Sequence, residues 1–133
     1  VPGATKGRIH KPVELLSIYP TLIDLCRLQV NPKLEGVSLK PLFKDSHSVW
    51  EHVAVSTLGH NNHAVRDERW RYIRYADGSE ELYDHQTDPN EWSNLAVQSS
   101  TQEHDRVITR LKKYLPGTNR LQRGTQSKKE NPL

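Results

Sequence analysis

The chain has 133 residues, of which 34% are hydrophobic and 26% charged, with one cysteine and no methionine. This size and composition fit one small globular domain and exclude two full domains. No run of about 18 apolar residues occurs and the first residues lack an apolar core, so we expect neither a membrane span nor a signal peptide. A chain that begins at Val1 and lacks methionine is expected to be a processed product or a piece of a longer protein. Cys26 alone excludes an internal disulfide and a multi-cysteine zinc site.

The net charge of +3 is unevenly distributed. Residues 1–116 carry 15 basic and 15 acidic side chains, so the whole excess lies in residues 117–133. That segment has too few apolar residues to offset its ordering entropy by burial, and we expect a basic, disordered tail. An arm that binds nucleic acid or another anionic polymer is the alternative, but so few charges favour a chain without a nucleic-acid partner.

The first elements are a linker and a helix. Prolines and glycines within residues 1–12 indicate a connection that enters from an earlier element. Ser17 is suited to cap a helix that has Pro20 in its first turn. We expect about three helical turns. Apolar residues recur at helical spacing and would face the core; they are Ile18, Leu22, Leu25 and Cys26. We expect Cys26 to be buried as a small hydrophobic residue.

A second, shorter helix is predicted within residues 34–43. Ser38 is suited to cap it, and Leu39, Leu42 and Phe43 would face inward. This helix is too short to be stable without neighbours.

Beyond residue 52 the apolar period shifts toward two, which is typical of strands. Four short strands are predicted, over residues 52–58, 62–66, 69–75 and 80–84, and they would form one antiparallel meander. Asp77-Gly78 is the strongest turn signal, because a tight hairpin needs residues that accept positive φ. In the third strand Trp70 and Tyr72 point to one face, and Arg71 and Ile73 point to the other.

A C-terminal helix would cover one face of this sheet. Ser100 and Glu103 suggest a capping box, and the helix would end at Pro116-Gly117. Its apolar stripe comprises His104, Val107, Ile108, Leu111, Tyr114 and Leu115. One helix buries one face only, so we expect the sheet face with Trp70 and Tyr72 to need another partner. The predicted fold class is α+β: a small four-stranded antiparallel sheet packed by a C-terminal helix, preceded by one or two short helices.

The loop 59–63 is the densest group of neutral hydrogen-bonding side chains in the chain. A metal site on His60 and His63 together with His52 is an alternative, but no cysteine or aspartate nearby in the sequence completes a ligand set, and we assign no metal ligand. His60, Asn62 and His63 are better suited to donate hydrogen bonds to hydroxyls or to an oxyanion. An ordinary polar turn is the alternative.

Three stretches in order carry a family resemblance: residues 13–26, residues 34–42, and the run RWRYIRYADGSEELYDHQTDPNEWSNLA at 69–96. Together they resemble the C-terminal part of a sulfatase, nearest to the iduronate-2-sulfatase-like and polysaccharide sulfatases of the alkaline phosphatase superfamily. The resemblance covers residues 1–116, with 1–12 as the incoming linker. Ser17 stands where such sequences often carry an acidic residue, which changes a helix cap only.

The resemblance implies a sulfuric-ester hydrolase, periplasmic or secreted, that uses a formylglycine nucleophile beside a calcium ion. In that family both belong to a larger N-terminal α/β catalytic domain, which would be this chain's partner. Cys26 does not match the motif that matures to formylglycine. We therefore assign no catalytic residue and no cofactor to this chain, and we expect it to be inactive alone while giving scaffold and pocket residues for a sulfated saccharide. A self-standing carbohydrate- or anion-binding module is the alternative.

Overall fold

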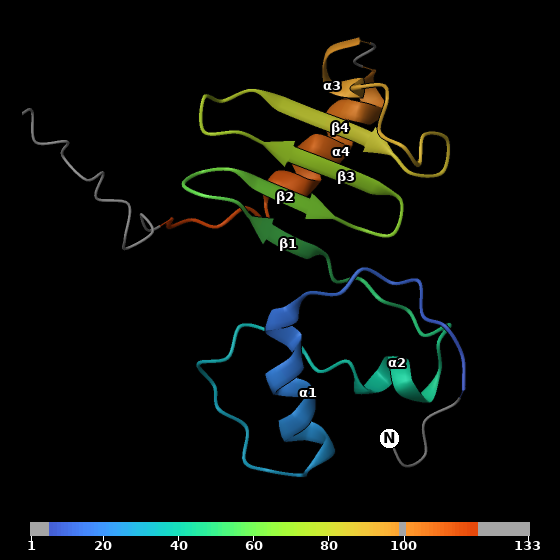
Figure 1. Cartoon of the computed structure of the whole chain (residues 1–133), viewed down its shortest axis with the longest axis vertical. Helices are drawn as coiled ribbons and strands as arrows, with labels where there is room; N and C mark the ends of the chain where they lie inside the picture. Colours follow the sequence, from blue (N-terminus) through green and yellow to red (C-terminus); the bar gives the residue numbers. More distant parts are fainter. Residues whose placement is uncertain (1–5, 99–100, 120–133) are drawn as a thin grey trace, which may run out of the picture.

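The computed structural model describes residues 6–98 and 101–119, which form two lobes, one above the other (Figure 1). The helical lobe, residues 6–52, contains the 3-10 turn η1 (Leu15–Ser17) and the helices α1 (Ile18–Leu25) and α2 (Lys40–Lys44). The sheet lobe, from residue 53 onward, contains β1 (Ala54–Thr57), β2 (His63–Arg66), β3 (Trp70–Arg74), β4 (Glu80–Asp84), α3 (Leu95–Gln98) and α4 (Gln102–Lys112). Within these described ranges no helix is long and apolar enough to cross a membrane.

The sheet is the antiparallel meander that the sequence predicts, with the strands in the order β1-β2-β3-β4. The β3–β4 hairpin turns at Gly78, whose φ of +88° favours glycine. Asp77 Oδ1 accepts hydrogen bonds from the Ser79 backbone nitrogen at 2.9 Å and from its hydroxyl at 2.6 Å, which fixes the turn. Together with the C-terminal helix and the short N-terminal helices, this sheet confirms the α+β fold.

Helix α4 packs against one face of the sheet and closes the hydrophobic core there (Figure 1). The buried members of this core are Val65, Trp70, Tyr72, Leu82, Val107, Ile108 and Leu111. The expectation that Trp70 and Tyr72 lie on an uncovered face is therefore wrong. Alternation along β3 places both rings on one face, and α4 covers that face because two large rings offer the most apolar area to bury.

The ends of α4 differ from the prediction. Ser100, the predicted capping residue, lies outside the described residues, and the cap is Thr101, whose side chain accepts from the backbone nitrogen of His104 at 3.2 Å. The helix ends at Lys112, before the predicted stop at Pro116-Gly117. Most of the predicted tail, residues 120–133, also lies outside the described residues, so the disorder of that tail stays a prediction.

Helix α1 begins after Ser17 as predicted, but the Ser17 side chain makes no capping hydrogen bond. The helix is about two turns long, and its predicted apolar stripe faces away from the interior. Ile18 and Leu22 are half exposed, and Cys26 is exposed, so the prediction of a buried Cys26 is wrong. The buried residues of this segment are Ser17, Thr21 and Ile23 instead. The spacing of the apolar residues identifies a face of the helix, but it does not say toward which neighbour that face points.

Helix α2 places Leu42 in the interior, as predicted, with 2% of the residue exposed. Leu39 and Phe43 are only half-buried. Leu39 occupies the N-cap position in place of Ser38, although the Ser38 hydroxyl still accepts from the Lys40 backbone nitrogen at 3.3 Å. The lobe is thus small and has little interior of its own.

Polar contacts link the two lobes. Lys11 Nζ donates to Glu68 Oε2 at 2.7 Å, and Glu14 Oε2 accepts from the backbone nitrogen of Val55 at 3.0 Å. Within the helical lobe, the Trp50 indole donates to the Pro12 carbonyl at 3.0 Å and ties the residues before β1 to the incoming segment.

Candidate functional site

The loop between β1 and β2 holds the predicted ligand-contacting side chains at one end of the sheet. Gly59 and Asn61 both take positive φ there, at +67° and +60°. The Leu58 backbone nitrogen donates to the Asn62 carbonyl at 3.0 Å and closes the loop. The result is a short, tightly turned projection beyond the strand ends.

The Asn62 side chain holds this loop together. Its Nδ2 donates to the carbonyls of Leu58 and His60 at 3.0 and 3.1 Å. Its Oδ1 accepts from the backbone nitrogen of Ala76, in the β3–β4 loop, at 3.0 Å. Asn62 therefore shapes the loop and ties it to the neighbouring hairpin, and it holds the backbone of His60 in place.

His63 lies beneath the loop, with 6% of the residue exposed. Its Nδ1 is 2.9 Å from the Thr57 hydroxyl, and its Nε2 is 3.3 Å from the Asn119 amide nitrogen. An amide nitrogen can only donate, so Nε2 accepts and the neutral ring carries its proton on Nδ1. This arrangement ties β1, β2 and the segment after α4 together at one point.

His60 is the predicted residue that faces solvent. Its imidazole makes no hydrogen bond within residues 6–98 and 101–119, whereas its carbonyl is held by Asn62. The structure thus brings the three predicted residues into one loop but gives them different positions. His60 is exposed, Asn62 is half-buried and His63 is buried.

The β3–β4 turn lies beside this loop, a neighbour that the sequence analysis did not include. A hollow of about 260 Å³ lies between them. Its lining comprises Asn61, His63, Arg74, Tyr75, Ala76, Gly78, Leu115 and Pro116. The predicted strand order could have shown that these two loops are neighbours, because in a meander the first and third loops lie at the same end of the sheet.

Arg74 lines this hollow, and Asp77 lies in the turn between the lining residues Ala76 and Gly78. The hydrogen bonds from Ser79 hold the pKa of Asp77 below its ordinary value, so Asp77 is a carboxylate at neutral pH. Burial, and secondarily the Glu81 carboxylate, raise the pKa of Tyr75, which keeps its hydroxyl as a donor. The Arg74 guanidinium is exposed at the rim. This set can hydrogen-bond a polyhydroxylated or sulfated ligand, and no described group here is arranged as a nucleophile with an adjacent base.

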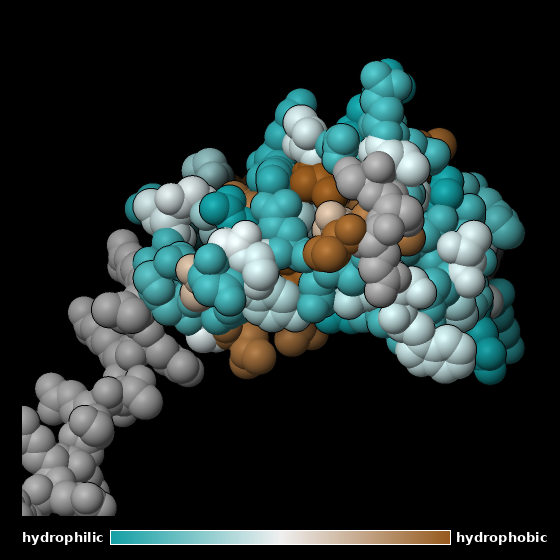
Figure 2. Space-filling model, turned by 90° about the horizontal axis from the view of Figure 1, so that it is seen from above, coloured by the Kyte–Doolittle hydropathy of each residue, from teal (hydrophilic) through white to brown (hydrophobic). Residues whose placement is uncertain are grey.

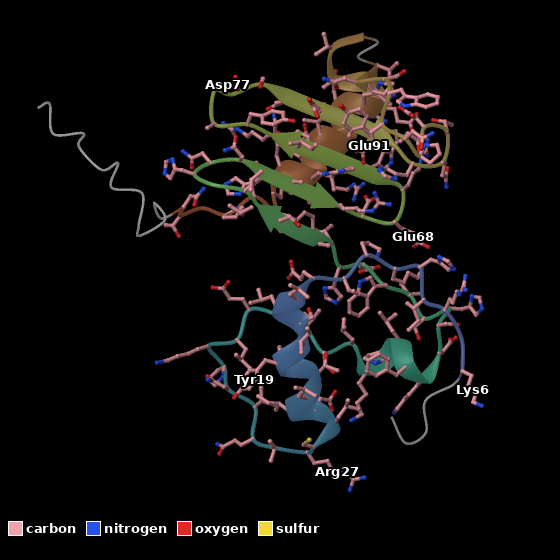
Figure 3. All side chains as sticks on the ribbon, viewed as in Figure 1. Lys6, Tyr19, Arg27, Glu68, Asp77 and Glu91 are labelled. Atoms are coloured by element: carbon pink, nitrogen blue, oxygen red, sulfur yellow. The ribbon has the colours of Figure 1, made fainter. Side chains whose placement is uncertain are left out.

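A second polar cluster occupies the sheet face opposite α4, where Glu91 is labelled in Figure 3. Arg71 Nη1 donates to Glu91 Oε2 at 2.8 Å, and His85 Nε2 lies 2.7 Å from Glu91 Oε1. Arg66 Nη1 approaches the same His85 ring at 2.8 Å. Burial alone would raise the pKa of Glu91, but the hydrogen bonds from Arg71 and His85 outweigh it and lower that pKa. These groups satisfy one another, and we assign the cluster to holding this face of the sheet.

The described residues do not fit a metal centre. Among them, no group of three or more histidine, cysteine, aspartate or glutamate side chains lies close enough to hold an ion. We therefore assign no metal ligand to residues 6–98 or 101–119 and derive no chemical step through a metal there.

The model of one protein family, described as N-sulphoglucosamine sulphohydrolase, C-terminal, matches residues 2–120 of the chain. A curated relative named Sulfatase, from Formosa agariphila, is 44% identical over 119 residues, which are 89% of this chain and 23% of that relative. Human Arylsulfatase K is 32% identical over 112 residues, covering 72% of this chain and 21% of that protein.

Among solved structures, one titled as a 2-O GAG sulfatase is similar to this fold, with a TM-score of 0.61 and 26% sequence identity. The match covers 84% of this chain and 26% of that one. The chain thus spans about a quarter of the length of the relatives that it matches, at 23% and 21% of the two curated proteins.

Proposed function

Because the chain belongs to the N-sulphoglucosamine sulphohydrolase C-terminal family, we propose that it is the C-terminal domain of a sulfuric-ester hydrolase that acts on a sulfated saccharide. The observation that carries this proposal is the match over residues 2–120. Relatives named as sulfatases, one of them 44% identical, support it. The solved structure titled as a 2-O GAG sulfatase supports a saccharide as the substrate.

The reaction would be hydrolysis of a sulfate ester: the bond between sulfur and the ester oxygen is broken, water gives its hydroxyl to sulfur and a proton to the leaving oxygen, and the products are the free alcohol and inorganic sulfate. Formylglycine and calcium, where the parent protein holds them, supply the nucleophile and the Lewis acid. The described residues of this chain fit neither role. We place both in the preceding catalytic domain of the parent, and this chain contributes scaffold and substrate contacts.

We assign the saccharide contacts to the β1–β2 loop, through His60, Asn62 and His63. His60 is exposed at the tip and is positioned to donate to a sugar hydroxyl or to a sulfate that does not react. Asn62 fixes the loop through its three hydrogen bonds. His63 supports the loop from below. A lost hydrogen bond costs about 0.5–1.5 kcal/mol with a neutral partner and about 1.5–3 kcal/mol with a charged one.

The test is His60→Ala in the intact parent enzyme. We expect kcat/KM for the sulfated polysaccharide to fall by roughly three- to a hundred-fold. Turnover of a small aryl sulfate, which lacks the sugar hydroxyls, should change little. Leu58→Ala is the matched control, because Leu58 lies in the same loop, is 84% exposed and has no polar group to lose.

Two results would contradict this assignment. Equal losses on both substrates would mean that the loop supports the structure of the enzyme rather than the saccharide. Unchanged activity on both substrates would mean that the loop does not touch the substrate. A parent protein that binds the polysaccharide but hydrolyses no sulfate ester would instead favour the binding-module interpretation.

A further inference from the structure

The two edge strands of the sheet differ in how their outward backbone groups are satisfied. At the β4 edge, Leu82 N donates to Asn94 Oδ1 at 3.1 Å, and Asn94 Nδ2 donates to the Glu80 carbonyl at 3.1 Å. The Asn94 side chain therefore takes the place of a neighbouring strand, and α3 also packs against β4. Figure 2 views the molecule from this end and shows a largely hydrophilic surface with small apolar patches. The β4 edge is thus closed by the chain itself.

The β1 edge is open at Thr57. Glu14 Oε2 accepts from the Val55 backbone nitrogen at 3.0 Å, so this N–H points away from β2. Backbone groups on one side of a strand recur at every second residue, so the Thr57 N–H and carbonyl also point away from β2. Within the residues that the structure describes, no hydrogen bond on that side meets these two groups. Thr57 therefore offers a donor and an acceptor with which an extended segment can pair.

A groove of about 670 Å³ lies beside this edge, between β1 and the η1 turn. Its lining includes three apolar side chains, Val13, Leu15 and Leu16, and two carboxylates, Glu14 and Glu35. Among the described residues no basic side chain lines the groove, and neither carboxylate is in an ion pair. The groove is therefore suited to an extended segment that carries both an apolar and a basic side chain.

The described part of the chain ends beside this groove. Tyr114 and Pro116, which follow α4, contribute to its lining. Asn119 Nδ2 lies 3.3 Å from His63 Nε2, and His63 is the register partner of Thr57. Figure 1 shows the segment after α4 passing the arrowhead of β1. The residues that follow Asn119 therefore begin at the Thr57 end of the open edge.

We propose that residues 120–123 bind along β1 as a fifth, antiparallel strand that pairs with the Thr57 backbone and ends at Glu14. The segment begins beside Thr57 and runs toward Ala54, which is the antiparallel direction. Four extended residues span up to about 13 Å, which is more than the two residues from Thr57 to Val55 require. Because Glu14 already accepts from the Val55 N–H, the pairing stops there.

The side chains of this segment match the groove. Leu121 and Arg123 are two residues apart, so in a strand both face the same side. Leu121 meets the apolar part of the lining, and Arg123 meets the Glu14 carboxylate. Residues 120–133 carry four basic side chains against Glu130 alone, so the charge of the segment is opposite to that of the groove.

This binding agrees with the composition of the C-terminal residues. A segment with too few apolar residues to fold alone can be ordered as an added strand, because backbone hydrogen bonds hold it. It also covers an edge that would otherwise be a template for pairing with another chain. Residues 124–133 lie beyond the edge and keep the disorder that their composition predicts. The proposal concerns contacts within this chain and does not depend on the proposed function.

The test is hydrogen exchange at the Thr57 backbone amide in the full chain, measured by NMR. Under the proposal a partner strand protects this amide, and removal of residues 120–133 should speed its exchange at least about ten-fold. Arg123→Glu should speed it about two- to five-fold, as expected for the loss of an exposed ion pair. The Tyr72 amide, in the inner strand β3, is the internal reference, and its unchanged exchange shows that the shortened chain is folded.

Lys128→Glu is the matched control, because it makes the same change of charge outside residues 120–123. It should leave exchange at Thr57 unchanged. Equal exchange at Thr57 with and without residues 120–133 would overturn the proposal. Protection that survives their removal and rises with protein concentration would overturn it in favour of a second copy at the edge. Protection that survives their removal and appears only in the full-length parent would overturn it in favour of the preceding part of that protein.

Discussion

Arg69 binds Asp84 through two parallel hydrogen bonds, from Arg69 Nε to Asp84 Oδ1 at 3.0 Å and from Arg69 Nη2 to Asp84 Oδ2 at 2.7 Å. The Asp84 side chain is only 5% exposed, and its Oδ1 also accepts from the backbone nitrogen of Gln86 at 3.0 Å. The guanidinium lies 4.4 Å from the centre of the Trp70 ring. The pair therefore fixes the start of β3 against the end of β4, where Trp70 and Asp84 are opposite each other.

Replacement of this carboxylate should be costly. Asp84→Asn keeps the shape but removes the charge that accepts both Arg69 bonds, and we expect the free energy of unfolding to fall by about 2–3 kcal/mol. Urea unfolding followed by tryptophan fluorescence measures this loss. Glu51→Gln, at an exposed position, is the control and should change stability by less than about 0.5 kcal/mol. Equal stability of the Asp84 variant and the unmodified chain would contradict the structural role of the pair.

The same pair sets a pH dependence. The hydrogen bonds from Arg69 are the main cause that lowers the pKa of Asp84. A carboxyl whose folded pKa is depressed contributes its full stability above the unfolded value, about 3.9 for aspartate, and loses it as the pH falls through the folded value. The free energy of unfolding should therefore decline below about pH 4, and less steeply in Asp84→Asn. Parallel pH profiles for the two proteins would contradict this prediction.

Gly36→Ala should unfold the helical lobe selectively. The new methyl group would stand 2.2 Å from the Leu16 carbonyl oxygen and 2.9 Å from the Ser17 nitrogen, so the backbone must move. Overpacking of this kind costs about 1–3 kcal/mol. Hydrogen exchange at the amides of α1 should accelerate while the strands keep their protection. Gly7→Ala, which has nothing within 4 Å of its added Cβ, is the control and should leave exchange unchanged.

Tyr72→Phe should not destabilise the protein. The Tyr72 hydroxyl is buried and makes no well-formed hydrogen bond among the residues that the structure describes. Burial, and secondarily the nearby Glu80 carboxylate, raise the pKa of Tyr72, so the hydroxyl is a neutral phenol, and its interaction with Glu80 does not offset the cost of its desolvation. We expect a melting temperature equal to or above that of the unmodified chain. Leu82→Ala, beside it in the core, should cost about 2–5 kcal/mol and shows that the measurement detects core changes.

Local signals in the sequence predicted the sheet well. The bounds of β4 are those predicted, residues 80–84, and the Asp77-Gly78 turn lies between β3 and β4. The buried residues of α4 follow the predicted stripe at Val107, Ile108 and Leu111. These features depend on residues that are close together along the chain, and the periodic spacing of apolar residues predicts such features directly.

The orientation of whole faces could not be predicted in the same way. Both faces of β3 carry rings or long side chains, so the pattern did not show that α4 would cover Trp70 and Tyr72. Likewise, the stripe of α1 is present in the sequence, but its outward direction depends on the contacts of Thr21 and Asp24 with residues 38–40. Such contacts join segments that are far apart in the chain, so the local spacing of apolar residues does not predict them.

The candidate site also depends on contacts between distant segments, which the sequence pattern does not predict. Its loop was located from its composition, but the bond from Ala76 to Asn62, which joins two hairpins, depends on the folded meander. The burial of His63 at the start of β2 and the exposure of His60 in the loop also depend on the turn made by Gly59 and Asn61, whose positive φ values the sequence did not reveal. The role of these residues in saccharide contact stays a prediction.

The division into two lobes bears on how the protein folds during synthesis. The core of the sheet lobe is closed by its own residues, including Tyr72, Leu82 and Leu111, so this lobe is suited to fold as one cooperative unit. The helical lobe is synthesised before the sheet lobe. In the parent protein that we propose, α1 and α2 would mature with the part of the polypeptide made before them, and the strands would fold later and independently. A cooperative folding boundary would therefore fall near residues 50–53, inside the matched family region rather than at its edge.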